Sequence, residues 1–229
     1  MGTVQDLDDQ HKNELVDGIA KALKLKKDGS FVVIGGGEWN LGRQLSVACG
    51  ANTYLFADND ETAIKAAEDE EIFVTELASS SDTAAIGSLG KFDGCLLKNY
   101  FECNRASEDL SLTSLFESLW KILKLNCRAV LVIRRTPKFP APQALKQRWS
   151  EQVPNDDQLA ELCKNEDATF ELEQSTLELK SKLSKDKLKD VLKAYNCDDN
   201  DVNSVLCDVG SQVEFDDEIT IIALTKVID

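Results

Sequence analysis

Three consecutive glycines, Gly35, Gly36 and Gly37, follow the apolar run FVVI and precede residues with helical spacing. A strand, a glycine turn and a helix in this order predict a loop whose backbone can approach a phosphate or a nucleoside closely. About 20 residues later, Asp58 ends the apolar run TYLFAD, where an acid can accept hydrogen bonds from both hydroxyls of a ribose. Together these residues predict a nucleoside-binding site.

Two features of this stretch leave other interpretations open. Trp39 places an indole where such turns usually hold a small residue, so its side chain would block the site. Asp58 and Asp60 also precede a helical stretch that begins near Glu61, where acids serve as N-caps. Asp58 can therefore bind a ligand, support the helix start, or do both.

Composition excludes several classes of function. The net charge of −15 argues against nucleic acid and against an anionic membrane surface as partners, because both require clustered Lys and Arg. The sequence contains no apolar run long enough to span a bilayer, and its acidic start does not resemble a secretory signal. Seven cysteines without a CxxC pair indicate reduced thiols in a cytoplasmic protein. With His11 as the one histidine, no metal site is expected.

Apolar strands alternate with amphipathic helices from residue 12 to residue 135. This alternation predicts an α/β fold with a doubly wound, mostly parallel sheet whose two faces are covered by helices. A sixth strand near 169–180, with its register disturbed near Gln174, and a last strand near 217–227 complete seven strands. We expect one domain over 1–229, with helical lid or insert regions at 137–168 and 181–210.

The chain resembles the class I S-adenosylmethionine-dependent methyltransferases over residues 12–136 and again in the last strand. VVIGGGEWNL corresponds to the glycine motif of the family, LFADNDETAI to its acidic second-strand end, FDGCLLKN to its fourth strand, and LFESLWKILKLNCRAVLVI to the helix, turn and fifth strand that follow. The resemblance implies a Rossmann-like methyltransferase fold with an antiparallel last strand.

The resemblance also implies site residues and a cofactor. S-adenosylmethionine would be held by the three glycines together with Asp58, Asn59 and Lys98. Asn99 and Tyr100, at the end of the fourth strand, would contact the substrate, and Lys98 is a further candidate for this contact. All three residues also fit an ordinary polar loop. The family motifs are eroded at Val33, at Trp39 and at the turn 125–127, where the family has an acid, a small residue and Pro-Gly-Gly.

Three functional hypotheses follow. The first is a methyltransferase of the small-molecule type, acting on an amine or a phospho-base. The second is an inactive pseudo-methyltransferase that serves as a binding or partner module. It follows from a looser resemblance of the chain to the non-catalytic half-domains of nematode phosphoethanolamine methyltransferases, which keep the sheet with eroded cofactor motifs. A weaker alternative is an NAD-dependent oxidoreductase, which lacks support because Asn40 stands where the third glycine of a dinucleotide motif is expected.

Overall fold

The structure is a computed structural model that describes residues 11–35, 39–79, 82–98, 100–103, 111–165 and 168–227. One sheet has the strand order β3-β2-β1-β4-β5-β8-β7-β6. Its strands are β1 (Ser30–Ile34), β2 (Thr53–Asp58), β3 (Phe73–Glu76), β4 (Phe92–Lys98), β5 (Leu123–Ile133), β6 (Lys164–Asn165), β7 (Ala168–Ser184) and β8 (Gln212–Lys226).

The first five strands are parallel, and the last strand is antiparallel to them. β1 pairs with β2 on one side and with β4 on the other, so β1 is central in the sheet. β8 runs antiparallel between β5 and β7. The predicted mostly parallel, seven-stranded sheet with an antiparallel last strand is confirmed, and the two-residue strand β6 adds a short eighth strand at the edge.

One detail of the sequence interpretation is wrong. The register between β7 and β8 runs without a shift from Phe170 opposite Lys226 to Ser184 opposite Gln212, so the predicted disturbance near Gln174 does not occur. The polar residues that suggested an interruption are tolerated because β7 is exposed on both faces there.

Helices cover both faces of the sheet. The helices are α2 (Lys12–Leu23), α3 (Trp39–Cys49), α4 (Glu61–Asp69), α5 (Thr83–Gly87), α6 (Tyr100–Cys103), α7 (Leu112–Ile122), α8 (Gln143–Gln152), α9 (Asp156–Leu162), α10 (Lys185–Ala194) and α11 (Asp199–Cys207).

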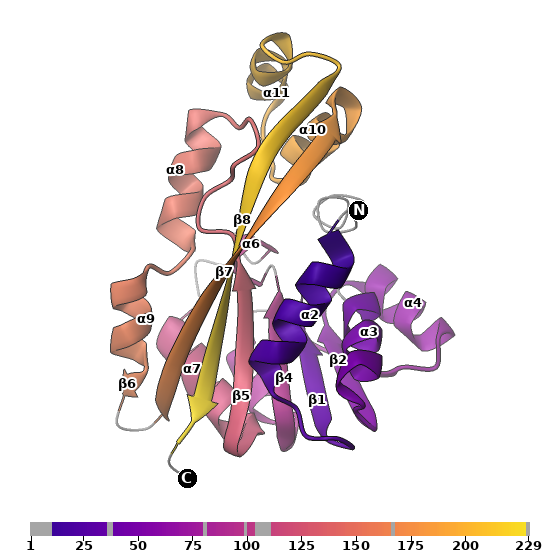
Figure 1. The fold of residues 1–229 in the computed structure, drawn as a ribbon, viewed down its shortest axis with the longest axis vertical. Helices are drawn as coiled ribbons and strands as arrows, with labels where there is room; N and C mark the ends of the chain where they lie inside the picture. The colour runs from indigo at the N-terminus through magenta and orange to yellow at the C-terminus, as the bar shows by residue number, and fades with distance from the viewer. Residues whose placement is uncertain are drawn as a thin grey trace.

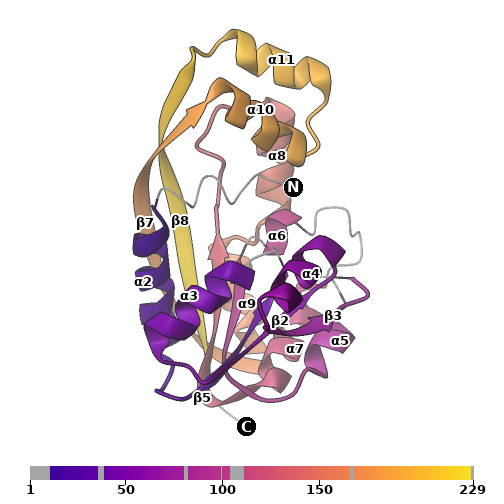
Figure 2. The same cartoon turned by 90° about the vertical axis from the view of Figure 1, so that its right-hand side faces the viewer.

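Alternate residues of the central strands supply two hydrophobic clusters. Phe31 and Val33 of β1 point toward α2, α3 and α4, whereas Val32 and Ile34 join the cluster formed with α5 and α7. Figure 2 shows these two helical layers on either side of the strands. Among the described helices, none is long and apolar enough to cross a membrane.

The strands β7 and β8 extend beyond the rest of the sheet as a two-stranded ribbon, with α10 and α11 at its far end and α8 beside it (Figure 1). Aromatic rings join these parts: Phe139 packs against Trp149, Tyr195 and Phe215 at centroid distances of 6.1–6.2 Å. The helices predicted within 137–168 and 181–210 are therefore tied to one another, and their action as a lid stays a prediction.

Gly42 allows α3 to lie directly on the sheet. A Cβ atom at this position would stand 2.7 Å from Cε2 of Tyr54 and 2.9 Å from Cγ2 of Val33. The Tyr54 ring cannot easily move away, because its hydroxyl donates to the carbonyl of Trp39 at 2.6 Å and its ring stacks on Phe31. The close packing of α3 on Val33 and on the Tyr54 ring therefore requires the absence of a side chain at residue 42.

We expect Gly42→Ala to destabilise the protein by about 1–3 kcal/mol through overpacking. The melting temperature should fall by roughly 2–4 °C for each kcal/mol. Gly87→Ala is the matched control, since its Cβ would meet no atom closer than 3.4 Å and alanine favours the helix. Equal melting temperatures for Gly42→Ala and wild type, measured by circular dichroism, would contradict the close packing described here.

Candidate functional site

Gly35 and Asp58 lie next to each other at the carboxyl edge of the sheet. The register pairs Ile34 with Ala57, so the next residue of each strand faces the other. Gly35 has φ +68° and donates its N–H to the carbonyl of Ala57 at 2.8 Å. The turn after β1 therefore begins in a left-handed conformation that favours glycine, beside the acid at the end of β2. Gly36 and Gly37 lie outside the described residues.

The Asp58 carboxylate also holds the turn that follows β2. Only 2% of the residue is exposed, and its Oδ1 accepts from the N–H groups of Asn59 at 2.7 Å and Asp60 at 3.1 Å. Asn59 itself is exposed. Asp60 is the N-cap of α4 and accepts from the amides of Thr62 and Ala63. The helix-cap interpretation is confirmed for Asp60, and Asp58 holds the backbone of Asn59 and of the cap residue Asp60.

Lys98 and Tyr100 are buried where β4 ends. Lys98 is 1% exposed and is the last residue of β4, and Tyr100 opens α6 with its ring packed edge-on against Phe101. Burial, reinforced by the nearby Cys95, raises the pKa of Tyr100 above its usual range. The interpretation of these two residues as an ordinary polar loop is wrong; Asn99, between them, lies outside the described residues.

Trp39 is the first residue of α3, and its side chain is half-buried against the hydrophobic cluster beneath α2 and α3. Its carbonyl receives the Tyr54 hydroxyl described above. The indole thus has a packing role of its own on this face of the sheet, which explains why a large residue is accepted directly after the glycine turn.

Sequence reasoning missed a buried ion pair at the same edge. Arg134, directly after β5, donates from Nε to Oδ2 of Asp217 at 2.9 Å, and both side chains are almost fully buried. The indole of Trp149 in turn donates to the carbonyl of Arg134. The two charges are 83 residues apart, so no local spacing could have revealed the pair.

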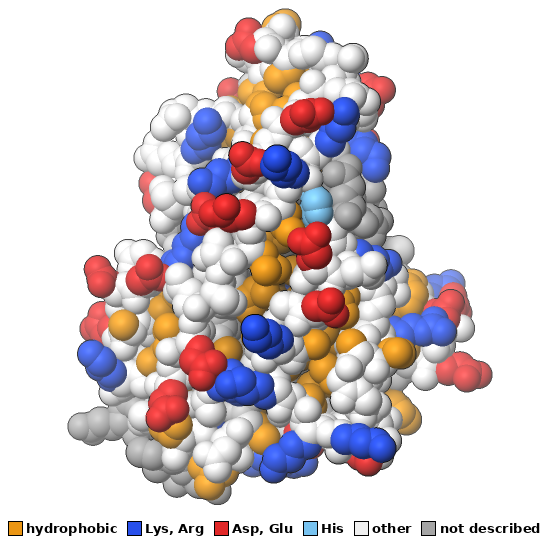
Figure 3. Space-filling model, in the orientation of Figure 1, with side chains coloured by type: hydrophobic (Ala, Val, Ile, Leu, Met, Phe, Trp, Pro, Cys, Tyr) orange, Lys and Arg blue, Asp and Glu red, His pale blue; other side chains and the backbone are white. Residues whose placement is uncertain are grey.

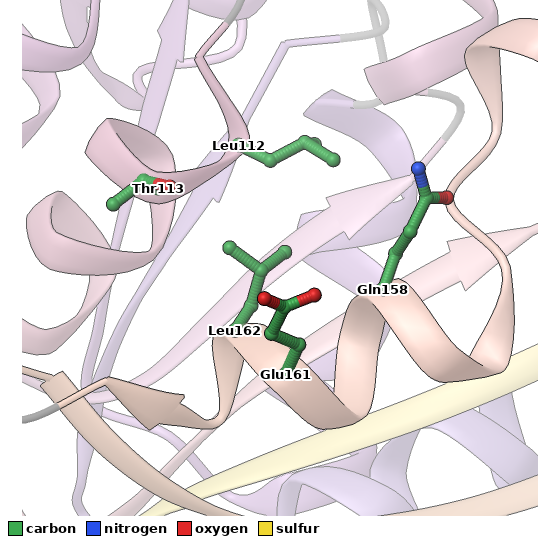
Figure 4. A pocket seen from close by; sticks show the side chains of 5 residues that line it. All are labelled: Leu112, Thr113, Gln158, Glu161 and Leu162. Atoms are coloured by element: carbon green, nitrogen blue, oxygen red, sulfur yellow. The ribbon is translucent and has the colours of Figure 1, made fainter.

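A hollow of about 460 Å³ lies between the first turn of α7 and α9. Figure 4 shows Leu112 from α7 and Leu162 and Gln158 from α9 around it. Thr113 and Glu161 complete its lining, and none of the predicted site residues contributes to it.

No group of three or more metal-ligating side chains occurs within the described ranges. The Nε2 atom of His11 instead lies 2.6 Å from the carbonyl oxygen of Lys180 in β7, so the imidazole donates to this carbonyl. On the face seen in Figure 3, acidic and basic side chains are interspersed over the described surface.

A scan against protein-family models and a search of the curated proteins give no match. Solved structures do match. The YcgJ protein of Bacillus subtilis aligns with a TM-score of 0.67 at 10% identity, over 95% of this chain and 100% of its own. The N-methyltransferase NodS of Bradyrhizobium japonicum aligns with a TM-score of 0.55 at 13% identity, over 97% of this chain and 100% of NodS.

The chain has the fold of the class I S-adenosylmethionine-dependent methyltransferases. A third match is phosphoethanolamine N-methyltransferase 2 of Haemonchus contortus, in complex with phosphomonomethylethanolamine and S-adenosylhomocysteine. Its TM-score is 0.56 at 13% identity, over 94% of this chain and 53% of that protein. In this methyltransferase fold, β1 and β4 flank the point where the strand order reverses, which is where α/β sheets bind ligands.

We expect Asp217→Leu to cost about 3–5 kcal/mol, because it leaves the Arg134 guanidinium buried without its carboxylate. Combining it with Arg134→Met should cost less than the sum of the two single changes, since the double variant buries no unpaired charge. Urea unfolding of the four proteins measures the coupling. Additive effects of the two substitutions would show that the ion pair does not connect β5 to β8 energetically.

Proposed function

We propose that this chain binds S-adenosylmethionine at the carboxyl edge of β1, β2 and β4 and acts as a small-molecule methyltransferase on an amine or phospho-base. The observation that carries the proposal is the adjacency of Gly35, in its left-handed conformation, and Asp58 at the carboxyl edge of β1 and β2, next to the point between β1 and β4 where the strand order reverses. An acid beside a glycine turn suits the ribose end of the cofactor in both residue type and position. The two N-methyltransferases among the structural matches support the amine specificity.

S-adenosylmethionine supplies a methyl group that is already activated on a sulfonium. The chain's own residues therefore need only bind both molecules and orient the nucleophile toward this methyl group. In this proposal Lys98, the last residue of the neighbouring strand β4, contributes to cofactor binding, and Asn99 and Tyr100 contact the substrate. This arrangement requires no general base.

A second candidate function is that of an inactive binding or partner module. It is favoured by the burial of Asp58, Lys98 and Tyr100, whose side chains lie within the protein. The amides of Asn59 and Asp60 already occupy one oxygen of Asp58, so a ribose would have to share this carboxylate with the turn. The methyltransferase and the partner module therefore differ in whether the nucleoside of the cofactor binds at this site.

A thermal-shift titration with S-adenosylhomocysteine separates them. A ligand at about 100 times its dissociation constant stabilises a protein by ~2.7 kcal/mol. At roughly 2–4 °C per kcal/mol, the melting temperature should rise by several degrees if a micromolar site exists. An unchanged melting temperature at millimolar ligand would leave the partner-module function.

Asp58→Ala should abolish this shift, whereas Asp60→Ala should retain it. Each variant removes one carboxylate, and the two positions are two residues apart. Asp60→Ala loses a helix cap worth about 0.5–2 kcal/mol but leaves the proposed ribose contact intact.

If wild type shows no shift, Trp39→Ala tests the blocking role predicted for the indole. Alanine keeps the backbone carbonyl that accepts the hydrogen bond from the Tyr54 hydroxyl. Binding that appears only in this variant would identify Trp39 as the obstacle.

A further inference from the structure

The outer edge of β7 has an open segment between two occupied ends. At one end, the N–H of Phe170 donates to the carbonyl of Cys163 beside β6, and at the other the Lys180 carbonyl receives His11. Both bonds leave β7 on the side away from β8. In an antiparallel strand the N–H and C=O of one residue point to the same side and alternate along the chain. The even-numbered residues of β7 therefore direct their backbone groups outward.

Four residues lie on this outward row between the two ends: Leu172, Gln174, Thr176 and Glu178. Within the described part of the chain, none of their backbone N–H or C=O groups has a hydrogen-bond partner. Their side chains are exposed, as are those at 171, 173 and 175, and Leu172 is 36% exposed. Residues 171–176 and 178 are therefore open to solvent, whereas Leu177 packs beside Gly18 of α2.

β7 lacks the usual protection of edge strands. Such strands are usually short or interrupted by proline or by a bulge. β7 has 17 residues, contains no proline and keeps an unbroken register with β8. Charged side chains remain as its one protective device, and over 171–178 all of them are glutamates: Glu171, Glu173 and Glu178.

These glutamates define the chemistry of an incoming strand. Glu173 is held by Arg128 through two hydrogen bonds of 2.7 and 2.8 Å, so its charge is compensated. Glu171 and Glu178 have no such ion pair among the described residues, and they lie near the two ends of the open segment, roughly 23 Å apart at the rise of a strand. A strand that pairs here would gain from a cation near each of its ends.

We propose that this open edge of β7 accepts an extended, cationic segment of a partner protein as an added strand. Main-chain hydrogen bonds to residues 172–178 supply the binding, and Lys or Arg side chains opposite Glu171 and Glu178 supply the selectivity. The occupied ends limit the added strand to roughly eight residues.

A second copy of β7 does not fit this segment. β6 lies beside the lower end of β7 and the start of α2 beside its upper half (Figure 1). The 17 residues of another β7 would continue past the opening and collide with one of these elements. The inference concerns a surface remote from Gly35 and Asp58 and is independent of cofactor binding.

The direct test is amide hydrogen exchange by NMR with the peptide acetyl-KTVTVTVK-amide as probe. In the free protein the amides of residues 172, 174, 176 and 178 should exchange fast, and those of 171, 173, 175 and 177 slowly, because only the latter face β8. Saturating peptide should slow exchange in the first set alone. The same peptide with alternate N-methylated residues should give no protection.

Charge and backbone variants complete the test. Glu171→Gln and Glu178→Gln should each weaken peptide binding, measured by fluorescence anisotropy, by roughly 1.5- to 5-fold. Glu68→Gln, an exposed change on α4, should leave binding unchanged. Thr176→Pro removes one outward N–H without affecting the ladder to β8, and it should abolish binding while the far-UV spectrum is retained.

Three results would overturn the proposal. The first is the absence of protection at millimolar peptide. The second is peptide binding that leaves the outward amides in fast exchange. The third is a dimer in sedimentation velocity that protects these amides without peptide, which would assign the edge to a second copy of the chain.

Discussion

The close contact of α3 with β1 and β2 is the constraint on which the candidate site depends. The glycine turn joins β1 to α3, so the position of α3 sets where the turn can lie. That position is fixed from two sides: Gly42 lets the helix backbone approach Val33 and Tyr54, and the Tyr54 hydroxyl holds the carbonyl of Trp39 at the start of the helix. A dinucleotide motif places a glycine for helix packing at the position of Asn40, and in this chain Gly42 has that role instead.

The sequence predicted the sheet well because the central strands are buried on both faces. Continuous apolar runs such as FVVI and AVLVI have no other stable location in a chain of this size, and each is followed by an amphipathic helix. The prediction was wrong for the register of β7, where Gln174 suggested an interruption. β7 is an edge strand with two exposed faces, so polar residues there carry no information about pairing.

The candidate site was predictable only in part. Chain order places Gly35, Asp58 and Lys98 at strand ends, and parallel strands bring those ends to one edge. The burial of Asp58 and Lys98 does not follow from their places at strand ends, and the pairing of Arg134 with Asp217 depends on a segment that returns from far along the chain. The spacing of residues in the sequence predicts which residue ends a strand. It does not predict how deeply that residue is buried in the folded chain.

The two halves of the β7–β8 ribbon differ in whether charged side chains on β7 have an oppositely charged residue across from them on β8. In the half nearest α10, Lys180 and Lys182 lie opposite Asp216 and Glu214, with 2.9 Å between Lys182 Nζ and Glu214 Oε1. These side-chain charges are balanced within the ribbon.

In the other half, the residues of β8 opposite the three glutamates are Thr225, Ala223 and Glu218. None of these can neutralise an acid, and Glu173 reaches across β8 to Arg128 on β5 for its partner. Between Glu218 and Thr225 most residues of β8 are apolar and buried in the core beside β5, and no residue opposite the three glutamates is basic. The uncompensated acids of β7 are thus a consequence of how the sheet is closed, and the solvent-facing edge is the side from which a balancing cation can approach them.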